Sequence, residues 1–328
     1  MNITLTLRIL GALLLFLAIA LLFPVPFSWF YGDGAAGAFC LSAIISAGCG
    51  GLLYSQFRSG ADLSVREGFA VVTFGWTFFA LFGALPFFFS GAIPSYLNAF
   101  FETMSGFTTT GSTILTDIEA MPPSLLLWRS LTQWLGGMGI IVLSLAILPM
   151  LGVGGMQLFK AEVPGPTADR LKPRIQDTAK LLWGVYVLLT GVEVILLMVG
   201  GMGFFDGINH AFTTMATGGF STRNDSVAAY DSAFIDWVIT LFMFLAGVNF
   251  SLHYLALRGK LGDFIRNEEF LFYSCLAMLG TTLIALLNMG GTYPDFFDNL
   301  RYSAFQVVSI LTTTGFGTAD YELWPVLC

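Results

Sequence analysis

The sequence is short of charged residues, cysteine and histidine. Only 11% of its 328 residues are charged, whereas a soluble domain carries about a quarter. The four scattered cysteines form no C-x-x-C pair and the two histidines lie far apart, which excludes the usual zinc motifs. The hydrolase signatures H-E-x-x-H and G-x-S-x-G are also missing, as is any pair of aspartates within an apolar segment. We therefore expect that the protein is not an enzyme and carries no cofactor.

Apolar residues dominate what is present. Hydrophobic residues make up 56% of the chain, 33 residues are phenylalanine, and the mean hydropathy is +0.78. A bilayer span needs about 20 mainly apolar residues. The sequence predicts an all-α membrane protein, with spans near Leu7–Phe30, Ala35–Phe57, Gly68–Ser90, Leu125–Leu151, Ala179–Gly200, Phe234–Leu257 and Phe270–Met289, and an eighth beginning near Leu323.

The few basic residues orient these spans. If the amino terminus is cytoplasmic, all but three of the 14 lysines and arginines fall in or beside cytoplasmic segments, the exceptions being Arg129, Arg223 and Arg301. The outward segments instead carry several aspartates and glutamates. These acids either raise the local cation concentration or are ordinary solvated loop charge. We expect a multi-pass protein in contact with lipid, with its amino terminus in the cytoplasm and no nucleic acid partner.

Three outward segments share one pattern. They read FETMSGFTTTGST (Phe101–Thr113), NHAFTTMATGGFST (Asn209–Thr222) and FQVVSILTTTGFGT (Phe305–Thr318). Each follows one apolar span and leads to another. Each also runs from mostly apolar residues into a threonine-rich stretch and an aligned glycine. A single such loop is uninformative, whereas three at matching places indicate a repeat architecture.

The repeated unit suits an ion pore. About ten to thirteen helical residues cover roughly 15–20 Å, so each short helix would enter the bilayer and stop near its middle. Non-helical backbone at that depth must be buried in protein or line water. Glycine permits a conformation that turns successive carbonyls inward, and rings of carbonyls replace the hydration shell of a potassium ion. The three loops therefore predict a cation-conducting pore.

Together with WRSLTQWLGGMGII (Trp128–Ile141) and NFSLHY (Asn249–Tyr254), these loops resemble the Trk/Ktr/HKT superfamily of potassium transporters over essentially the whole chain. Within it, the sequence is most similar to the bacterial Trk-type membrane subunits. In that family, tandem span–re-entrant pore helix–filter loop–span repeats fold like a single-chain potassium channel, here after two additional amino-terminal helices. The resemblance implies potassium uptake through the bacterial inner membrane, with one filter glycine in each repeat.

Carried onto this sequence, the resemblance implies three parts of a potassium filter. They are Thr108, Thr109, Thr110 and Gly111 in the first repeat, Ala216, Thr217, Gly218 and Gly219 in the second, and Thr312, Thr313, Thr314 and Gly315 in the third. The second part has Gly218 where the first has a threonine. Phe220 and Phe316 stand where the first has Ser112. These differences change side chains rather than carbonyls, so the potassium interpretation stands.

The same alignment divides the chain into four parts. Two additional helices occupy residues 1–60, a first pore repeat 61–157, a second 158–262 and an incomplete third 263–328. The family's fourth repeat is absent from the sequence, and so is its loop within the third inner helix. We therefore expect an amino-terminal portion of a longer transporter, which would not conduct potassium selectively by itself. The alternative is a natural short form that completes its pore by association.

The family also implies partners. Its complete members form homodimers and bind a cytoplasmic nucleotide-binding regulatory subunit, which the basic segment Lys160–Lys180 would face. An ordinary juxtamembrane loop would look the same.

Two other functions stay open at this point: a non-transporting sensor or scaffold, and a relative that carries sodium with potassium by symport. Glu193, inside a span, is either structural or part of the ion pathway. Gly136, Gly137 and Gly139 allow either close helix packing or a hinge.

Overall fold

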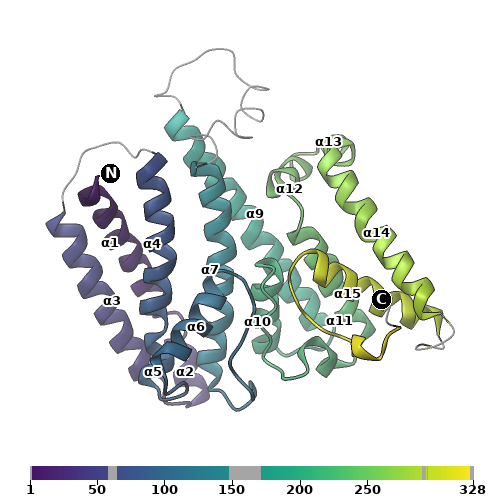
Figure 1. Cartoon of the computed structure of the whole chain (residues 1–328), viewed down its shortest axis with the longest axis horizontal. Helices are drawn as coiled ribbons and strands as arrows, with labels where there is room; N and C mark the ends of the chain where they lie inside the picture. Colours follow the sequence, from purple (N-terminus) through teal and green to yellow (C-terminus); the bar gives the residue numbers. More distant parts are fainter. Residues whose placement is uncertain (1, 58–64, 148–170, 290–292, 294, 326–328) are drawn as a thin grey trace. The chain divides into compact units, whose positions relative to one another are not determined.

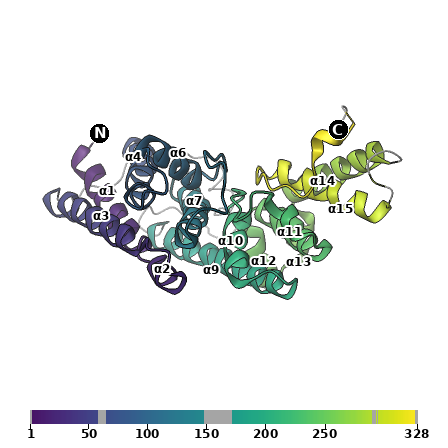
Figure 2. The same ribbon diagram turned by 90° about the horizontal axis from the view of Figure 1, so that it is seen from below.

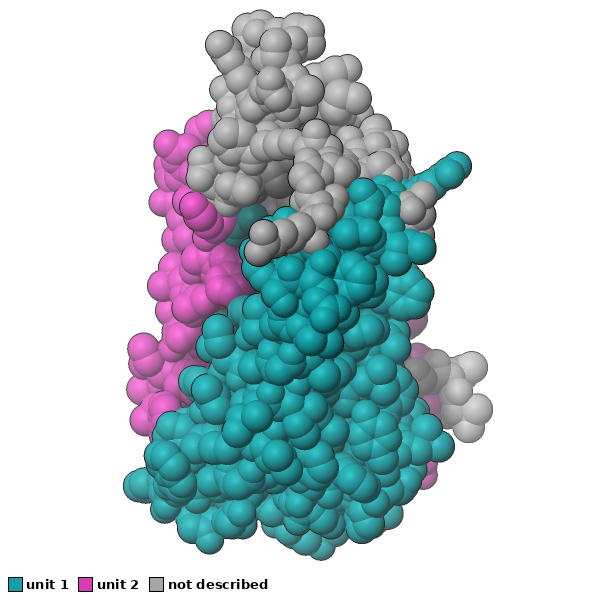
Figure 3. Space-filling view, turned by 90° about the vertical axis from the view of Figure 1, so that its left-hand side faces the viewer, with its two compact units in different colours: residues 1–108, 112–179 teal, residues 109–111, 180–328 magenta. Residues whose placement is uncertain are grey.

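The structure is a computed structural model, and it describes residues 2–57, 65–147, 171–289, 293 and 295–325. Helices form nearly all of its regular structure (Figures 1 and 2). The chain divides into two compact units, one of residues 1–108 and 112–179 and the other of residues 109–111 and 180–328 (Figure 3). The boundaries that the sequence predicts for its four parts stay a prediction.

The first unit begins with two consecutive helices and a third that packs beside them. A turn ending at Pro24 separates α1 (Ile3–Ala20) from α2 (Val25–Tyr31), because proline lacks a backbone N–H and restricts the residue before it. The next helix, α3 (Ala36–Gln56), packs along α1. Where they cross, a β-carbon on Gly11 would lie only 2.8 Å from the carbonyl oxygen of Gly50. Glycine on both helices therefore lets the two backbones touch, as at many membrane helix crossings.

The first repeat completes this unit. Helices α4 (Val65–Gly83) and α5 (Leu85–Phe89) lead to the short α6 (Tyr96–Phe107), and α7 (Pro123–Ile147) packs against α6. Gly136 of α7 lies against the carbonyl of Phe107 with no room for a β-carbon, and Gly139 faces the ring of Trp76. Close packing, one of the two roles that the sequence left open, therefore accounts for Gly136 and Gly139.

The second unit contains most of α9 (Leu171–Val199), the short helix α10 (Phe204–Met215), and α11 (Ala233–Ala246), α12 (Phe250–Leu257) and α13 (Leu261–Arg266). It continues with α14 (Glu268–Asn288) and α15 (Phe296–Leu311). Within this unit α15 packs against both α14 and α11 (Figures 1 and 2).

The three short helices differ in length. Both α6 and α10 have 12 residues, in the expected range, whereas α15 has 16. The extra length lies at the start of α15. There the side chain of Asp295 accepts hydrogen bonds from the backbone N–H groups of Phe297 and Asp298, at 3.0 and 3.1 Å. This cap satisfies two free donors of the first turn and stabilises the start of the helix.

The predicted span Phe234–Leu257 is not a continuous helix: α11 and α12 are two helices bent by 103° at a short break, and together they are long and apolar enough for one span. The break frees carbonyl groups at the end of α11. The hydroxyl of Tyr273 donates to the carbonyl of Phe244 at 3.2 Å, and Nε2 of His253 lies 2.8 Å from the carbonyl of Leu245. Because a carbonyl only accepts, His253 carries its proton on Nε2. The hydroxyl of Tyr273 thus pairs a carbonyl at the break, while the carbonyl of Leu245 accepts from both His253 and the backbone N–H of Val248.

Within the described part of the chain, five helical segments are long and apolar enough to cross a membrane, or six if α11 and α12 count as one span. The five are Ile3–Tyr31, Ala36–Gln56, Arg66–Phe89, Ala179–Val199 and Glu268–Asn288, all of which the sequence predicted. Helix α7 occupies the predicted span Leu125–Leu151, whose last residues lie outside the described part. Near Leu323, where an eighth span was expected, the structure describes only a short turn at Tyr321–Leu323.

Candidate functional site

Each predicted filter loop begins where a short helix ends. Helix α6 ends at Phe107, α10 at Met215 and α15 at Leu311, and the next residue of each donates its backbone N–H back to the last turn. The carboxyl end of a helix carries a partial negative charge. All three loops therefore start at a point that favours a cation.

The backbone then takes the same unusual path in all three loops. The threonine two residues before each glycine has a positive φ, which is 53° at Thr109, 53° at Thr217 and 61° at Thr313. The glycines follow with φ of 79° at Gly111, 71° at Gly219 and 82° at Gly315. The left-handed conformation costs a residue with a side chain about 1–2 kcal/mol, and β-branched threonine is an outlier there. Strain repeated at matching positions is typical of a functional backbone.

The second loop is held by the last turn of α10. The backbone N–H groups of Gly218 and Gly219 donate to the carbonyl of Thr213, at 2.9 and 3.4 Å. In a trans peptide the N–H and the preceding C=O point in opposite directions. The carbonyls of Thr217 and Gly218 therefore point away from α10.

The third loop repeats this arrangement on α15. The backbone N–H groups of Thr314 and Gly315 donate to the carbonyl of Ser309, at 2.9 and 3.3 Å. The carbonyls of Thr313 and Thr314 therefore point away from α15. The hydroxyls of Thr312 and Thr314 lie 2.7 Å apart and bond to each other, so these two threonines brace the loop.

The second and third loops touch. Gly219 lies against the carbonyl of Thr314 so closely that no β-carbon fits between them. The tip of the first loop, residues 109–111, belongs to the same compact unit as these two loops. That unit therefore contains eleven of the twelve residues that the sequence assigns to the potassium filter: Thr109, Thr110, Gly111, Ala216, Thr217, Gly218, Gly219, Thr312, Thr313, Thr314 and Gly315. The twelfth, Thr108, caps α6 in the first unit.

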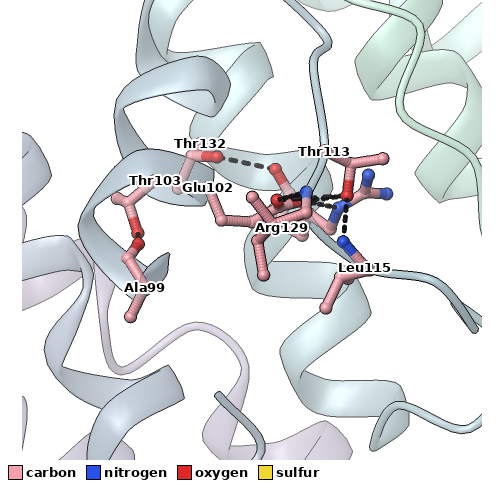
Figure 4. A network of polar contacts seen from close by, with 8 residues as sticks. Ala99, Glu102, Thr103, Thr113, Leu115, Arg129 and Thr132 are labelled. Carbon is pink, nitrogen blue, oxygen red and sulfur yellow. Dashed lines mark hydrogen bonds and ion pairs between the residues drawn. The ribbon is translucent and has the colours of Figure 1, made fainter. Parts of the chain in front are cut away.

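Behind the first loop lies a buried network around Glu102 of α6 (Figure 4). Its carboxylate accepts hydrogen bonds from the hydroxyl of Thr113, at 2.9 and 3.1 Å, and from the backbone N–H of Ile114 at 3.0 Å. It also pairs with Nε of Arg129 on α7 at 2.6 Å, with both side chains at most 2% exposed. The hydroxyl of Thr113 in turn accepts from the backbone N–H of Leu115. A buried charge needs a partner of opposite charge, which Arg129 supplies. The same carboxylate also binds Thr113 and Ile114, the residues that follow the first filter loop.

Behind the second loop, two side chains of α10 bind the segment that follows the filter glycine. Nε2 of His210, on α10, lies 3.0 Å from the hydroxyl of Ser221, and both residues are buried. One turn earlier, Asp206 accepts from the hydroxyl of Thr222 at 2.7 Å and from Arg223 at 3.0 Å. His210 thus has a polar packing role, and its partner Ser221 lies in the segment that follows the filter glycine.

Behind the third loop, the hydroxyl of Ser309 donates to the carbonyl of Phe316 at 2.8 Å. The next residue, Gly317, is held by the second repeat. Its N–H donates to the hydroxyl of Ser226 at 3.2 Å, and its carbonyl accepts from the N–H of Ala228 at 3.1 Å. The segment after the third filter glycine is therefore held partly by the second repeat, through one side-chain contact and one backbone contact.

The described residues contain no group of three or more histidine, cysteine, aspartate or glutamate side chains that could hold a metal ion. The oxygen atoms that the three loops themselves offer are backbone carbonyls and threonine hydroxyls. Such ligands suit an alkali cation that exchanges its water shell for oxygen atoms.

The roles of Glu102, Thr113, Arg129 and Ser221 were not predicted from the sequence. A signal was nevertheless present. When the three segments are aligned on their glycines, the ninth residue before the glycine is polar in each, although the short helices are mostly apolar there. Glu193, for which the sequence left a structural role and a place in the ion pathway open, is fully buried in α9.

Comparison with known proteins identifies the family. The family described as "TrkH: Cation transport protein" matches residues 37–327. The chain belongs to this family of cation transport proteins. It is 41% identical over 330 residues to the Trk system potassium uptake protein TrkH of Halomonas elongata, with 99% of this chain and 68% of that protein aligned. It is also 41% identical over 324 residues to the TrkH of Escherichia coli, with 97% of this chain and 67% of that protein aligned.

The fold agrees with that of a solved member of the TrkH family. The crystal structure of the potassium transporter TrkH from Vibrio parahaemolyticus matches with a TM-score of 0.91 at 34% sequence identity, over 100% of this chain and 68% of that one. The chain thus spans about two thirds of the length of these relatives. Membership of the family and the apolar helices together make the protein an integral membrane transporter with several spans.

Proposed function

We propose that this TrkH-family protein takes up potassium, and that the ion is selected by the backbone carbonyls of three loops: Thr108–Gly111, Thr217–Gly219 and Thr313–Gly315. The observation that carries the proposal is the repeated backbone path, with a left-handed threonine and a left-handed glycine at matching positions. The hydrogen bonds behind the second and third loops support it, because they turn carbonyls away from the short helices. The names of the relatives support potassium as the ion.

The remaining parts of the proposal concern the setting of the pore. The protein is a transporter rather than an enzyme. It lies in the bacterial inner membrane with its amino terminus in the cytoplasm, as the distribution of lysine and arginine supports. Its partners are a second copy of the protein and a cytoplasmic nucleotide-binding regulatory subunit that faces Lys160–Lys180. The pore repeats follow the boundaries given above, at residues 61–157, 158–262 and 263–328.

Ion uptake by a bacterium that lacks its own potassium uptake systems tests this function. One strain expresses this chain alone. A second expresses it fused to the part of the Halomonas elongata relative that the chain does not cover. We expect growth at low external potassium, and potassium uptake that exceeds sodium uptake, in at least one strain. Absence of uptake from both strains would overturn the proposal, provided that both proteins reach the membrane and the intact relative restores growth.

A further inference from the structure

The three repeats share a second pair of aligned positions besides the filter glycine. The first is the ninth residue before the glycine, on the short helix, and it is Glu102, His210 or Gln306. The second is the second residue after the glycine, and it is Thr113, Ser221 or Gly317. In the first two repeats the helix residue is hydrogen-bonded to a hydroxyl at the later position, although the two pairs differ in charge and chemistry.

The first pair is built into the interior of the first unit. Glu102 bonds to both the hydroxyl of Thr113 and the backbone of Ile114, while Arg129 neutralises its charge from the neighbouring helix. Figure 4 shows the three side chains directed toward one another between α6, α7 and the loop. The strained segment runs from Thr109 to Gly111, and its beginning is held by α6. Because Thr113 lies two residues after Gly111, the contact with Glu102 holds the end of that segment.

The second pair also holds the segment after its filter glycine, but it contains no ion pair. His210 and Ser221 are buried, and their side chains meet at 3.0 Å. The ring of His210 also packs against Phe316, with ring centroids 5.7 Å apart. The residue that holds the second loop therefore also touches the third.

The third pair is incomplete. Gln306 is buried, and its Nε2 has no hydrogen-bond partner among the described residues. Gly317, at the position of Thr113 and Ser221, has no side chain to offer. Both residues line a cavity of about 580 Å³ in the second unit.

We propose that Glu102 and His210 are positioning residues of the ion site, each holding the segment after the filter glycine through the hydroxyl of Thr113 or Ser221. This inference rests on the proposed function and adds residues that do not touch the ion. A carbonyl site distinguishes potassium from sodium through the number and placement of its oxygens. A loop fixed only at its helix end can contract around the smaller ion, whereas a loop fixed at both ends cannot.

Paired variants of the full chain test the first positioning residue. Thr113→Val removes the hydroxyl while keeping the shape and the ion pair, and Thr113→Ser restores the hydroxyl. Glu102→Gln removes the charge. Glu67→Gln is the matched control, because Glu67 is another buried carboxylate of the first unit and accepts a hydrogen bond from the backbone N–H of Asn2.

Two measurements are made on each variant. Amide hydrogen exchange of the purified protein reports how tightly residues 112–114 are held. Competition of sodium with potassium uptake, in the strain that transports, reports selectivity. Loss of a hydrogen bond to a charged group corresponds to a change on the order of tenfold. We expect that Thr113→Val and Glu102→Gln speed exchange at residues 112–114 and lower potassium-over-sodium discrimination by about that factor, while Thr113→Ser and Glu67→Gln behave as wild type.

The outcomes separate this inference from the proposed function. Unchanged exchange and unchanged discrimination in Thr113→Val would overturn the positioning role, even if Glu102→Gln fails to fold. Faster exchange with unchanged discrimination would overturn its link to selectivity. If the wild-type protein transports no potassium, the proposed function falls, and exchange in Thr113→Val alone decides whether the contact holds the loop.

Discussion

Gly219 of the second loop lies against the carbonyl oxygen of Thr314 in the third, with no space for a β-carbon between them. This contact ties two repeats together at the site where an ion would bind. The glycine is thus required both for its φ of 71° and for its lack of a side chain.

Gly219→Ala should abolish selective uptake, because it adds both backbone strain and a direct clash with the third loop. Gly315→Ala is the matched comparison. Its φ is 82°, but a β-carbon at this position would have no neighbouring atom within 4 Å, so the variant adds strain alone, of about 1–2 kcal/mol. We expect a clearly milder loss of potassium uptake from Gly315→Ala. Equal losses from the two variants would show that the contact with Thr314 is unimportant.

Gly317→Ser should stabilise the protein. A serine here would supply the hydroxyl that Thr113 and Ser221 provide in the other repeats and would give Gln306 a partner. The site has open space for a side chain, and its φ is outside the left-handed region. One new hydrogen bond contributes about 0.5–1.5 kcal/mol. Thermal unfolding in detergent measures the gain, and Gly317→Ala, which adds no hydroxyl, is the control. Equal midpoints for the two variants would contradict the prediction.

Tyr273→Phe should destabilise the break between α11 and α12. The variant leaves the carbonyl of Phe244 without this donor, and an unsatisfied buried group costs about 1–3 kcal/mol. Tyr254→Phe on α12 controls for loss of a tyrosine hydroxyl from the same region. Unfolding midpoints and protease sensitivity at the break measure the effect. The prediction fails if the two variants are equally stable.

Asp33→Asn should lower stability at neutral pH. Asp33, between α2 and α3, accepts from the hydroxyl of Ser28 and from the backbone N–H groups of Ser124 and Ala35, at 2.9 and 3.1 Å. Burial raises the pKa of Asp33, but these hydrogen bonds outweigh it and leave the pKa below its ordinary value. The resulting stability is present above the unfolded pKa of about 3.9 and is lost as the pH falls through the folded pKa.

We expect a loss of about 1 kcal/mol at pH 7 for Asp33→Asn, because partial exposure weakens the interaction. The difference from wild type should shrink below about pH 4. Unfolding midpoints across this range measure it, and Asp225→Asn at an exposed loop position is the control. A difference that does not change with pH would exclude the ionised carboxylate as the cause.

The orientation of the chain can be tested by labelling single cysteines. With Cys40, Cys49, Cys275 and Cys328 replaced by serine, Asp225→Cys should react with a membrane-impermeant maleimide added to intact cells. Lys260→Cys should react only after the membrane is opened. Reaction of Lys260→Cys from outside would reverse the proposed topology.

The sequence predicted the features that depend on local pattern. The threonine–glycine loops, the short helices before them and five apolar spans are all visible as composition and spacing. The left-handed φ of Thr109, Thr217 and Thr313 was not predictable, because threonine disfavours this conformation and only the surrounding structure imposes it.

Two further features depend on contacts that a linear pattern does not reveal. The break after α11 contains no proline, and the residues around it are as apolar as those of a continuous span. Its stability depends on Tyr273, which belongs to the next span. Similarly, the pairing of Glu102 with Arg129 needs two helices to meet. Only the alignment of the repeats on their glycines, with polar residues nine positions earlier, gave an indication of the site around Glu102.

The strained threonines link ion occupancy to the shape of the loops. Each of Thr109, Thr217 and Thr313 would be more stable in another conformation by about 1–2 kcal/mol. A cation that binds the carbonyls of the strained form opposes that relaxation, and removing the cation leaves only the protein contacts to do so. Since 1.4 kcal/mol is a factor of ten in population, each empty loop would leave its ion-binding shape more readily by about that factor. An emptied pore should therefore differ in structure from a filled one. Because Gly219 contacts Thr314, a change in the shape of the second loop would also displace the third loop.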